Sequence, residues 1–122
     1  MNNRKRHNFK NLKIWQESIK LVSDTYELTR TFPKFEIYNL SNQLNRCSVS
    51  IPSNISEGTS KSSDKHLNKY LEDSLGSAFE WETQLIVAFN ENYLDIDKFK
   101  ELEGKIIKIQ RMISGFQETL DI

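Results

Sequence analysis

The residues best suited to chemistry gather in one stretch, RCSVSIPSNISEGTS, at positions 46–60. It holds the single cysteine of the chain, several serines and an asparagine. A serine or cysteine nucleophile needs a neighbouring base, but both histidines, His7 and His66, lie outside this stretch. Cys47 falls in a row of apolar residues, where a free cysteine is typical of a protein core. We therefore predict no catalytic residue here.

The sequence also lacks the residue patterns that are typical of metal and cofactor sites. A zinc site takes a full set of ligands, usually Cys or His, and the chain has one cysteine and two histidines in all. The Glu-x-x-His pairs of di-iron bundles and a Gly-rich phosphate loop are absent from the sequence. Glu80 and Glu82 point to different faces of a helix, so they make a poor acid–base pair. We predict no enzyme, no metal and no cofactor.

Positive charge is concentrated at the start of a chain whose net charge is zero. Five basic residues and no acidic residue occur in residues 1–13: Arg4, Lys5, Arg6, Lys10 and Lys13. Such an arm either contacts the phosphates of RNA or DNA or is a solvated terminus that aids solubility. We treat residues 1–8 as a flexible basic arm in front of a helical domain at residues 9–122.

Two rows of polar residues are the second candidate site. One row is Gln43, Arg46, Ser50, Asn54 and Glu57, and the other is Asp73, Ser77, Glu80 and Gln84. Each spacing puts its row on one face of a helix, and the absence of lysine favours partly buried, paired groups. We expect the rows to face each other or a neighbouring subunit, with Arg46 paired to Glu80 or Glu57. The alternative is an ordinary solvated stripe.

The elements that must position these residues are four helices. Segments of about 9–31, 36–58, 63–92 and 95–120 repeat apolar residues at helical spacing, and none alternates like a strand. The clearest row is Phe99, Leu102, Ile106, Ile109, Ile113, Phe116 and Leu120. Ser63 and Asp95 are suitable N-caps for the third and fourth helices. Because short connections make long helices antiparallel neighbours, we expect an all-α fold, an antiparallel up-down-up-down four-helix bundle.

Pro52 interrupts the polar stretch but not its helical pattern. An apolar row continues straight through it: Ile37, Leu40, Leu44, Cys47, Ile51 and Ile55. A proline inside a helix kinks it rather than always ending it. We expect the hydroxyls of Ser48, Ser50 and Ser53 to bond to the carbonyl groups that it frees. A loop that carries chemistry is the alternative.

Other features point to close packing and to self-association. Gly76 lies in the middle of the third helix, where glycine costs about 1 kcal/mol relative to alanine, so we expect another backbone to approach it. The first helix has two apolar lines. Four aromatic residues exceed the obvious needs of one core, namely Phe32, Phe35, Tyr38 and Trp81. An oligomer interface would accommodate them. The alternative is a monomer whose core is large enough to bury them.

The bulk properties fit one domain of 122 residues. No apolar run approaches the ~20 residues of a membrane span, and no apolar stretch follows the basic N-terminus as in a signal peptide. One cysteine allows no internal disulfide. We expect a cytoplasmic protein with no membrane partner.

A resemblance to a known family rests on three segments: FKNLKIWQESIKLV, FPKFEIYNLSNQLNRCSVSIPSNISEGTSK and GSAFEWETQL. They resemble the bacterial four-helix bundle family first found in intervening sequences of 23S rRNA genes, some members of which carry a ribosomal-protein label. The matching positions are Trp15, Pro33, Glu36, Leu40, Gln43, Arg46, Ser50, Pro52, Asn54, Glu57, Gly58, Gly76, Ser77 and Glu80. The chain departs from the usual family pattern at Cys47, Ser56, Ser60 and Lys61.

The resemblance implies a four-helix bundle that assembles as a homopentamer. It also implies kinship with the accessory protein of diversity-generating retroelements, which binds nucleic acid and a reverse transcriptase. Our favoured interpretation is a non-enzymatic, self-assembling bundle. The alternatives are an RNA-binding module that uses a basic N-terminal rim, and a protein adaptor for a reverse transcriptase or a similar partner.

Overall fold

The computed structural model describes residues 6–122, which contain helices and no strand. The four α-helices are α1 (Lys13–Thr29), α2 (Leu40–Thr59), α3 (Asp64–Asn90) and α4 (Ile96–Glu118). Two short 3-10 turns are η1 (Phe9–Asn11) and η2 (Lys34–Glu36). The predicted all-α class with four helices is confirmed.

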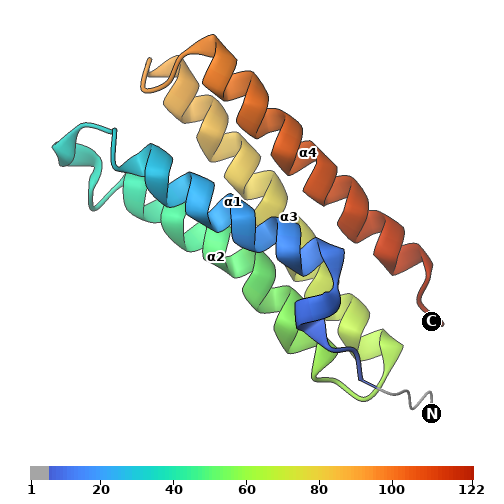
Figure 1. The fold of residues 1–122 in the computed structure, drawn as a ribbon. Coiled ribbons are helices and arrows are strands. Elements are labelled where there is room, and N and C mark those ends of the chain that lie inside the picture. Colours follow the sequence, from blue (N-terminus) through green and yellow to red (C-terminus); the bar gives the residue numbers. More distant parts are fainter. Residues whose placement is uncertain (1–5) are drawn as a thin grey trace.

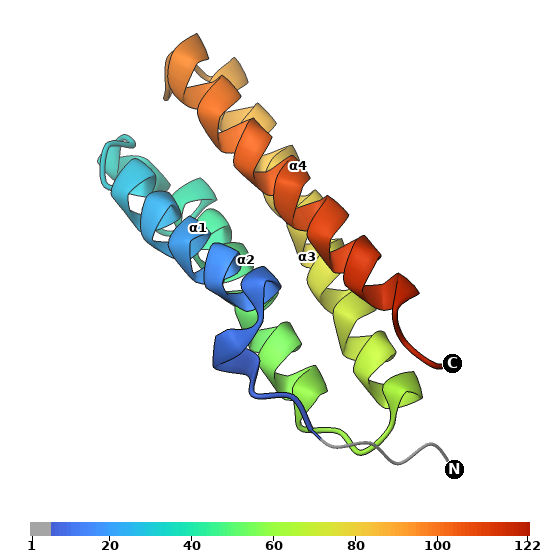
Figure 2. The same cartoon turned by 45° about the vertical axis from the view of Figure 1, so that its right-hand side comes forward.

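The helices pack as a bundle in which each α-helix runs beside two others. α1 lies beside α2 and α4, and α3 lies beside the same two helices. The Cα atoms of α1 and α3 stay more than 8 Å apart in the described chain, but side chains join these two helices in the core, where Trp81 of α3 bonds to Thr25 of α1. In Figure 1 the α1–α2 and α3–α4 connections lie at one end of the bundle, and the α2–α3 connection lies at the other end with the C-terminus. Figure 2 shows the α1–α2 pair and the α3–α4 pair as two layers.

The helix starts follow local capping chemistry. Ser63 Oγ accepts the backbone N–H of His66 at 3.3 Å, and Asp95 Oδ1 accepts that of Lys98 at 2.8 Å. Each bond satisfies an N–H group that has no partner inside its helix. Both predicted N-caps are therefore confirmed.

The first two helices start later than the apolar pattern predicts. Residues 9–11 form the separate turn η1, so α1 begins at Lys13. The connection after α1 folds into η2, so α2 begins at Leu40. Ile37, which the pattern places in the apolar row of this helix, lies outside it and is exposed. A local turn has thus replaced the helix at each of these starts.

α2 and α3 approach each other closely at Gly58. A Cβ atom on Gly58 would lie 2.9 Å from Leu67 Cδ1 and 2.9 Å from Tyr70 Cβ. Gly76, predicted to allow such an approach, has no atom of another helix within 4 Å of the position of a Cβ. That prediction is wrong for the described chain because Gly76 lies on the exposed side of α3.

The core includes Trp81, whose large side chain is completely buried. Its Nε1 donates to Thr25 Oγ1 at 3.1 Å, and Thr25 Oγ1 donates to the carbonyl oxygen of Leu21 at 2.6 Å. α4 contributes the buried residues Leu102, Ile106, Ile109 and Ile113 from its predicted row. Trp81 is therefore not surplus to the core, and that expectation is wrong.

The other three aromatic residues divide between core and surface. Phe32 is buried and packs at 5.1 Å, between ring centroids, from Tyr93 of the α3–α4 turn. Phe35 and Tyr38 are 71% and 90% exposed. Phe32 therefore belongs to the core, and the expectation that it is surplus is wrong. Phe35 and Tyr38 lie outside the core of the described chain.

α1 buries only one of its two apolar lines. The inward line consists of Ile14, Leu21 and Leu28. The second line stays near the surface, where Ile19 is 39% and Tyr26 is 38% exposed. A single chain therefore leaves part of the apolar surface of α1 in contact with water.

α2 continues without a break through Pro52, which is buried. This confirms a helix and excludes the loop alternative. The predicted role of the serine hydroxyls is wrong: Ser48 Oγ donates to a carbonyl oxygen one turn earlier at 2.7 Å, and Ser50 Oγ bonds to Ser77 Oγ at 2.8 Å. Ser74 of α3 donates to the carbonyl oxygen of Ile51, the residue before the proline, at 2.9 Å.

Candidate functional site

The two predicted polar rows meet across the face between α2 and α3. Ser50 Oγ and Ser77 Oγ are hydrogen-bonded, and Asn54 Nδ2 donates to the carbonyl oxygen of Ser50 at 2.9 Å. The rows border an open groove of about 660 Å³, which we call the α2–α3 groove. Its lining includes Gln43, Arg46, Ser50, Ser77, Glu80 and Gln84. The structure thus brings the two rows together within one chain.

The charged members of the rows are not paired in the described chain. Arg46 forms no ion pair with Glu57 or Glu80, so the predicted pairing is wrong for the described chain. All three side chains are exposed, as is Gln43. At such positions hydration competes with pairing, and an ion pair contributes little. The half-buried members are Ser50, Asn54, Ser77 and Gln84.

Cys47 lines the α2–α3 groove but is unsuited to nucleophilic chemistry. Its Sγ donates to the carbonyl oxygen of Ser77 at 3.1 Å. Burial and the neighbouring Glu80 carboxylate raise the pKa of the Cys47 thiol to about 12. Because the thiolate is the nucleophile, a thiol protonated at neutral pH is inert. The structure supports a core role for this cysteine.

The basic arm is described only from Arg6 onward, so Arg4 and Lys5 lie outside the described residues. Arg6 Nε donates to the carbonyl oxygen of Ser60 at 2.7 Å. The ring of His7 packs edge-on against an aromatic ring of α4, with 5.5 Å between centroids. The described part of the arm is therefore bound to the α2–α3 connection and to α4.

Further basic residues lie at this end of the bundle. Lys10 and Lys13 are exposed beside the arm, and Lys65 and Lys69 are exposed in the first turns of α3. Sequence reasoning missed the pair on α3, although a spacing of four puts both lysines on one helix face. The basic surface thus comes from two distant segments of the chain.

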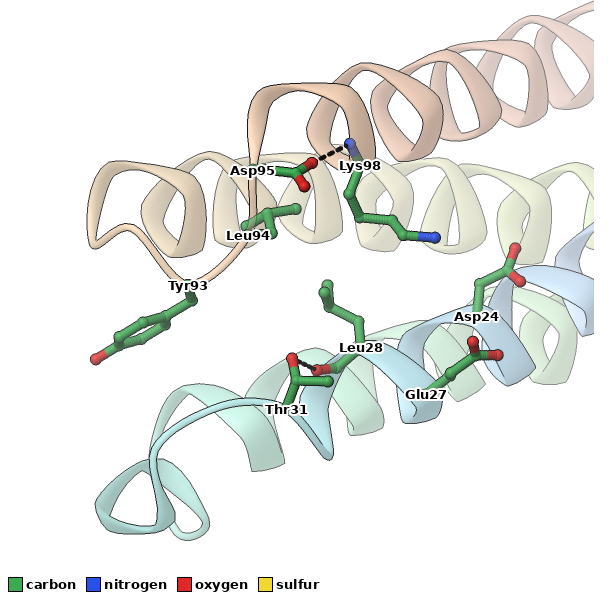
Figure 3. A pocket seen from close by; sticks show the side chains of 8 residues that line it. All are labelled: Asp24, Glu27, Leu28, Thr31, Tyr93, Leu94, Asp95 and Lys98. Carbon is green, nitrogen blue, oxygen red and sulfur yellow. Dashed lines mark hydrogen bonds between the residues drawn. The ribbon is translucent and has the colours of Figure 1, made fainter.

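A cavity of about 360 Å³ lies between α1 and the start of α4, and sequence reasoning missed it (Figure 3). Its charged residues are Asp24, Glu27, Asp95 and Lys98. Two of the carboxylates are already engaged: Asp24 accepts from Lys105 Nζ at 2.8 Å, which raises the pKa of Lys105, and Asp95 caps α4. In Figure 3 the Lys98 ammonium points across the opening toward Asp24. The cavity joins segments far apart in the sequence, so no local motif marks it.

Residues 6–122 contain no group of three His, Cys, Asp or Glu side chains placed to hold a metal ion. His66 Nδ1 is hydrogen-bonded to Ser63 Oγ at 2.8 Å, within the cap of α3. In the same part of the chain, no helix is both long enough and apolar enough to cross a membrane.

Comparison with known proteins identifies a family. The family described as 23S rRNA-intervening sequence protein matches residues 10–115. The chain belongs to this family. The resemblance drawn from the sequence segments is therefore confirmed, and the 23S rRNA-intervening sequence protein match extends over α1, α2 and α3 and into α4.

A solved crystal structure shares the fold. It is that of a protein with unknown function from the S23 ribosomal protein family of Bacteroides thetaiotaomicron VPI-5482. The TM-score is 0.80 at 19% sequence identity, and the similarity covers 87% of this chain and 99% of that one. No curated protein matches this chain.

Proposed function

We propose that this member of the 23S rRNA-intervening sequence protein family is a non-enzymatic, self-assembling bundle whose up-down-up-down protomers form a closed homopentamer. The observation that carries the proposal is the exposure of apolar side chains on two different sides of the bundle. A closed ring of identical chains joined head to tail needs two different surfaces on each chain.

The first surface, the α1–α2 flank, consists of Trp15, Ile19, Val22 and Val49. Ile19 and Val49 are each 39% exposed, and the other two are half-buried. The three α1 residues are spaced by four and three positions, so they share one helix face. Covering this flank would remove apolar area from water, at about 25 cal/mol per Å².

The second surface, the α3–α4 flank, consists of Phe79, Ile86 and Ile107. Phe79 is 54% and Ile86 is 39% exposed. Phe79 and Ile107 border an open groove of about 520 Å³ between α3 and α4. Because the α1–α2 pair and the α3–α4 pair form separate layers (Figure 2), the two flanks belong to different sides of the bundle. An exposed apolar flank and a grooved apolar flank suit head-to-tail assembly.

Two charge substitutions test this arrangement. Ile19→Glu disrupts the α1–α2 flank and Phe79→Glu disrupts the α3–α4 flank, so each variant alone should have the mass of one chain, 14.4 kDa. A mixture of the two should form a one-to-one pair of twice that mass, because each supplies the flank that the other lacks. Such a pair cannot grow further. Size-exclusion chromatography with light scattering measures these masses.

Ile122→Glu is the matched control, because Ile122 is 71% exposed but lies on neither flank. It should keep the mass of the unmodified protein. An Ile19→Glu variant that assembles normally contradicts the proposal, and so does a mixture in which both variants remain single chains.

RNA binding is a second candidate function, favoured by the basic residues that gather at one end of the bundle. Lys10, Lys13, Lys65 and Lys69 are exposed there, and Arg6 is bound to Ser60 of the α2–α3 connection. A ring would repeat this basic surface in every copy and so strengthen its attraction for phosphates.

The salt dependence of RNA affinity tests the second candidate. If Lys65 and Lys69 each neutralise one phosphate, Lys65→Gln with Lys69→Gln should lower the slope of log K against log salt by about 1.4 for single-stranded RNA. Fluorescence anisotropy from about 50 to 200 mM salt measures it. Lys98→Gln with Lys100→Gln, at the other end of the bundle, should change neither affinity nor slope. Absence of binding at the lowest salt would eliminate this candidate.

A further inference from the structure

A cavity of about 340 Å³ opens at the corner where α1 ends, η2 follows and α2 begins. Its apolar part is formed by Tyr26, Phe32 and Ile37. Tyr26 and Ile37 are 38% and 53% exposed, while Phe32 is buried. The volume falls within the range of small-molecule sites, which are concave and largely apolar with a few polar groups. Neither candidate function above uses this cavity.

The α2 side of the cavity contains a buried hydroxyl without a partner. Ser41 is only 6% exposed, and its Oγ has no hydrogen-bond partner among the described residues. Asn45, also in the lining, accepts a bond from Thr29 Oγ1 through Oδ1 at 2.9 Å, which leaves its Nδ2 group as a donor. An unpaired buried polar group destabilises a fold. We therefore look outside the chain for the hydrogen-bond partner of the Ser41 hydroxyl.

The N-terminus of α2 adds partial positive charge beside this hydroxyl. The N-cap residue Asn39 makes no side-chain capping bond, and the first turn contains no acidic residue. Glu36 accepts the N–H of Leu40 at 3.3 Å and the hydroxyl of Tyr93 at 2.7 Å. The next two N–H groups of α2 have no acceptor among residues 6–122. Free N–H groups at a helix start favour an anion.

Two cations border the opening, and no carboxylate lines the cavity. Arg30 and Lys34 are exposed, and neither forms an ion pair with a described residue. The cavity of Figure 3, formed with other residues of α1, has the opposite character, because Asp24 and Glu27 line it. Charge therefore distinguishes the two cavities, and only the one at the α1–α2 corner favours an anion.

We propose that the cavity at the α1–α2 corner binds a small organic anion that carries an apolar or aromatic body. The anionic group accepts hydrogen bonds from the Ser41 hydroxyl and the Asn45 amide and lies near Arg30 and Lys34. The body packs on Tyr26 and the apolar side of the cavity. This site does not depend on self-assembly or on RNA binding.

Calorimetric titration of the full chain with three probes tests the proposal. Phenyl phosphate combines both required parts and should bind with a Kd of about 1 mM or lower. Phenol and inorganic phosphate each supply one part, so each should bind about tenfold more weakly. Arg30→Gln with Lys34→Gln should weaken phenyl phosphate about tenfold. Lys100→Gln, an exposed lysine of α4 outside the cavity, should leave it unchanged.

Ser41→Ala separates binding from folding. Removal of an unpaired buried hydroxyl should keep or raise the thermal midpoint, while the affinity for phenyl phosphate falls about threefold through loss of one donor. The proposal is overturned if this variant binds phenyl phosphate normally or if the Arg30→Gln, Lys34→Gln variant does. Phenol that binds as tightly as phenyl phosphate, or phenyl phosphate that does not bind at all, also overturns it.

Discussion

Replacement of Trp81 by alanine should lower the free energy of unfolding by about 3–5 kcal/mol, the cost of removing a large aromatic side chain from a packed core. Trp81 has no exposed surface, and it is among the largest fully buried side chains in the described chain. Its indole Nε1 also donates to Thr25 Oγ1 at 3.1 Å, so alanine removes a buried hydrogen bond together with packing. The hole would lie where α3 meets α1.

Urea titration measures this loss. One fixed protein concentration is used because the proposed self-assembly would make stability concentration-dependent. Two substitutions of Thr25 isolate the hydrogen bond. Thr25→Val leaves the indole N–H buried without an acceptor and should cost about 1–3 kcal/mol, whereas Thr25→Ser keeps the hydroxyl and should cost less. If Trp81→Ala lowered the free energy of unfolding by less than about 1 kcal/mol, that result would contradict the conclusion that this side chain is tightly packed in the core.

Gly58→Ala should lower the free energy of unfolding by about 1–3 kcal/mol, the cost of overpacking. The added methyl group would lie 2.9 Å from Tyr70 Cβ and 3.3 Å from the carbonyl oxygen of Leu67. Neither atom is the end of a flexible side chain, so relief requires α2 and α3 to separate. Alanine is the better helix former, and here steric contact outweighs that preference.

Gly104→Ala is the control for this substitution. Gly104 is an exposed residue inside α4, and a Cβ there meets no atom of another helix within 4 Å. The same change should therefore raise the free energy of unfolding by about 0.5–1 kcal/mol through helix propensity alone. If Gly58→Ala also stabilised the protein, the close approach at the end of α2 would be ruled out.

Features that depend on local chemistry could be predicted from the sequence. The caps Ser63 and Asp95 bond to backbone groups within a few positions, and the apolar row of α4 repeats a spacing that only one helix face can satisfy. The same periodicity showed that α2 would continue through Pro52. These signals need no knowledge of neighbouring helices.

Features that depend on which helices touch could not be predicted. Trp81 is assigned to the core only once α1 is known to supply Thr25 as its acceptor. Gly58 and Gly76 both lie within helices, yet a neighbouring helix packs closely only on Gly58. Periodicity identifies a buried face, but it does not say where two faces come closest.

The candidate sites divide in the same way. Helical spacing predicted the polar rows that border the α2–α3 groove, but not the exposure of Arg46, which depends on the surroundings of the two helices. The basic arm was evident from composition, whereas Lys65 and Lys69 joined it only through the fold. The cavity at the α1–α2 corner depends on η2, a turn that the apolar pattern did not predict.

The mass of the unmodified protein in solution tests self-assembly most directly. Size-exclusion chromatography with light scattering should give five times 14.4 kDa, or 72 kDa. That value would mean that the apolar flanks on α1–α2 and α3–α4 are covered by neighbouring copies. A value of 14.4 kDa would contradict this account, because the flanks would then remain in water.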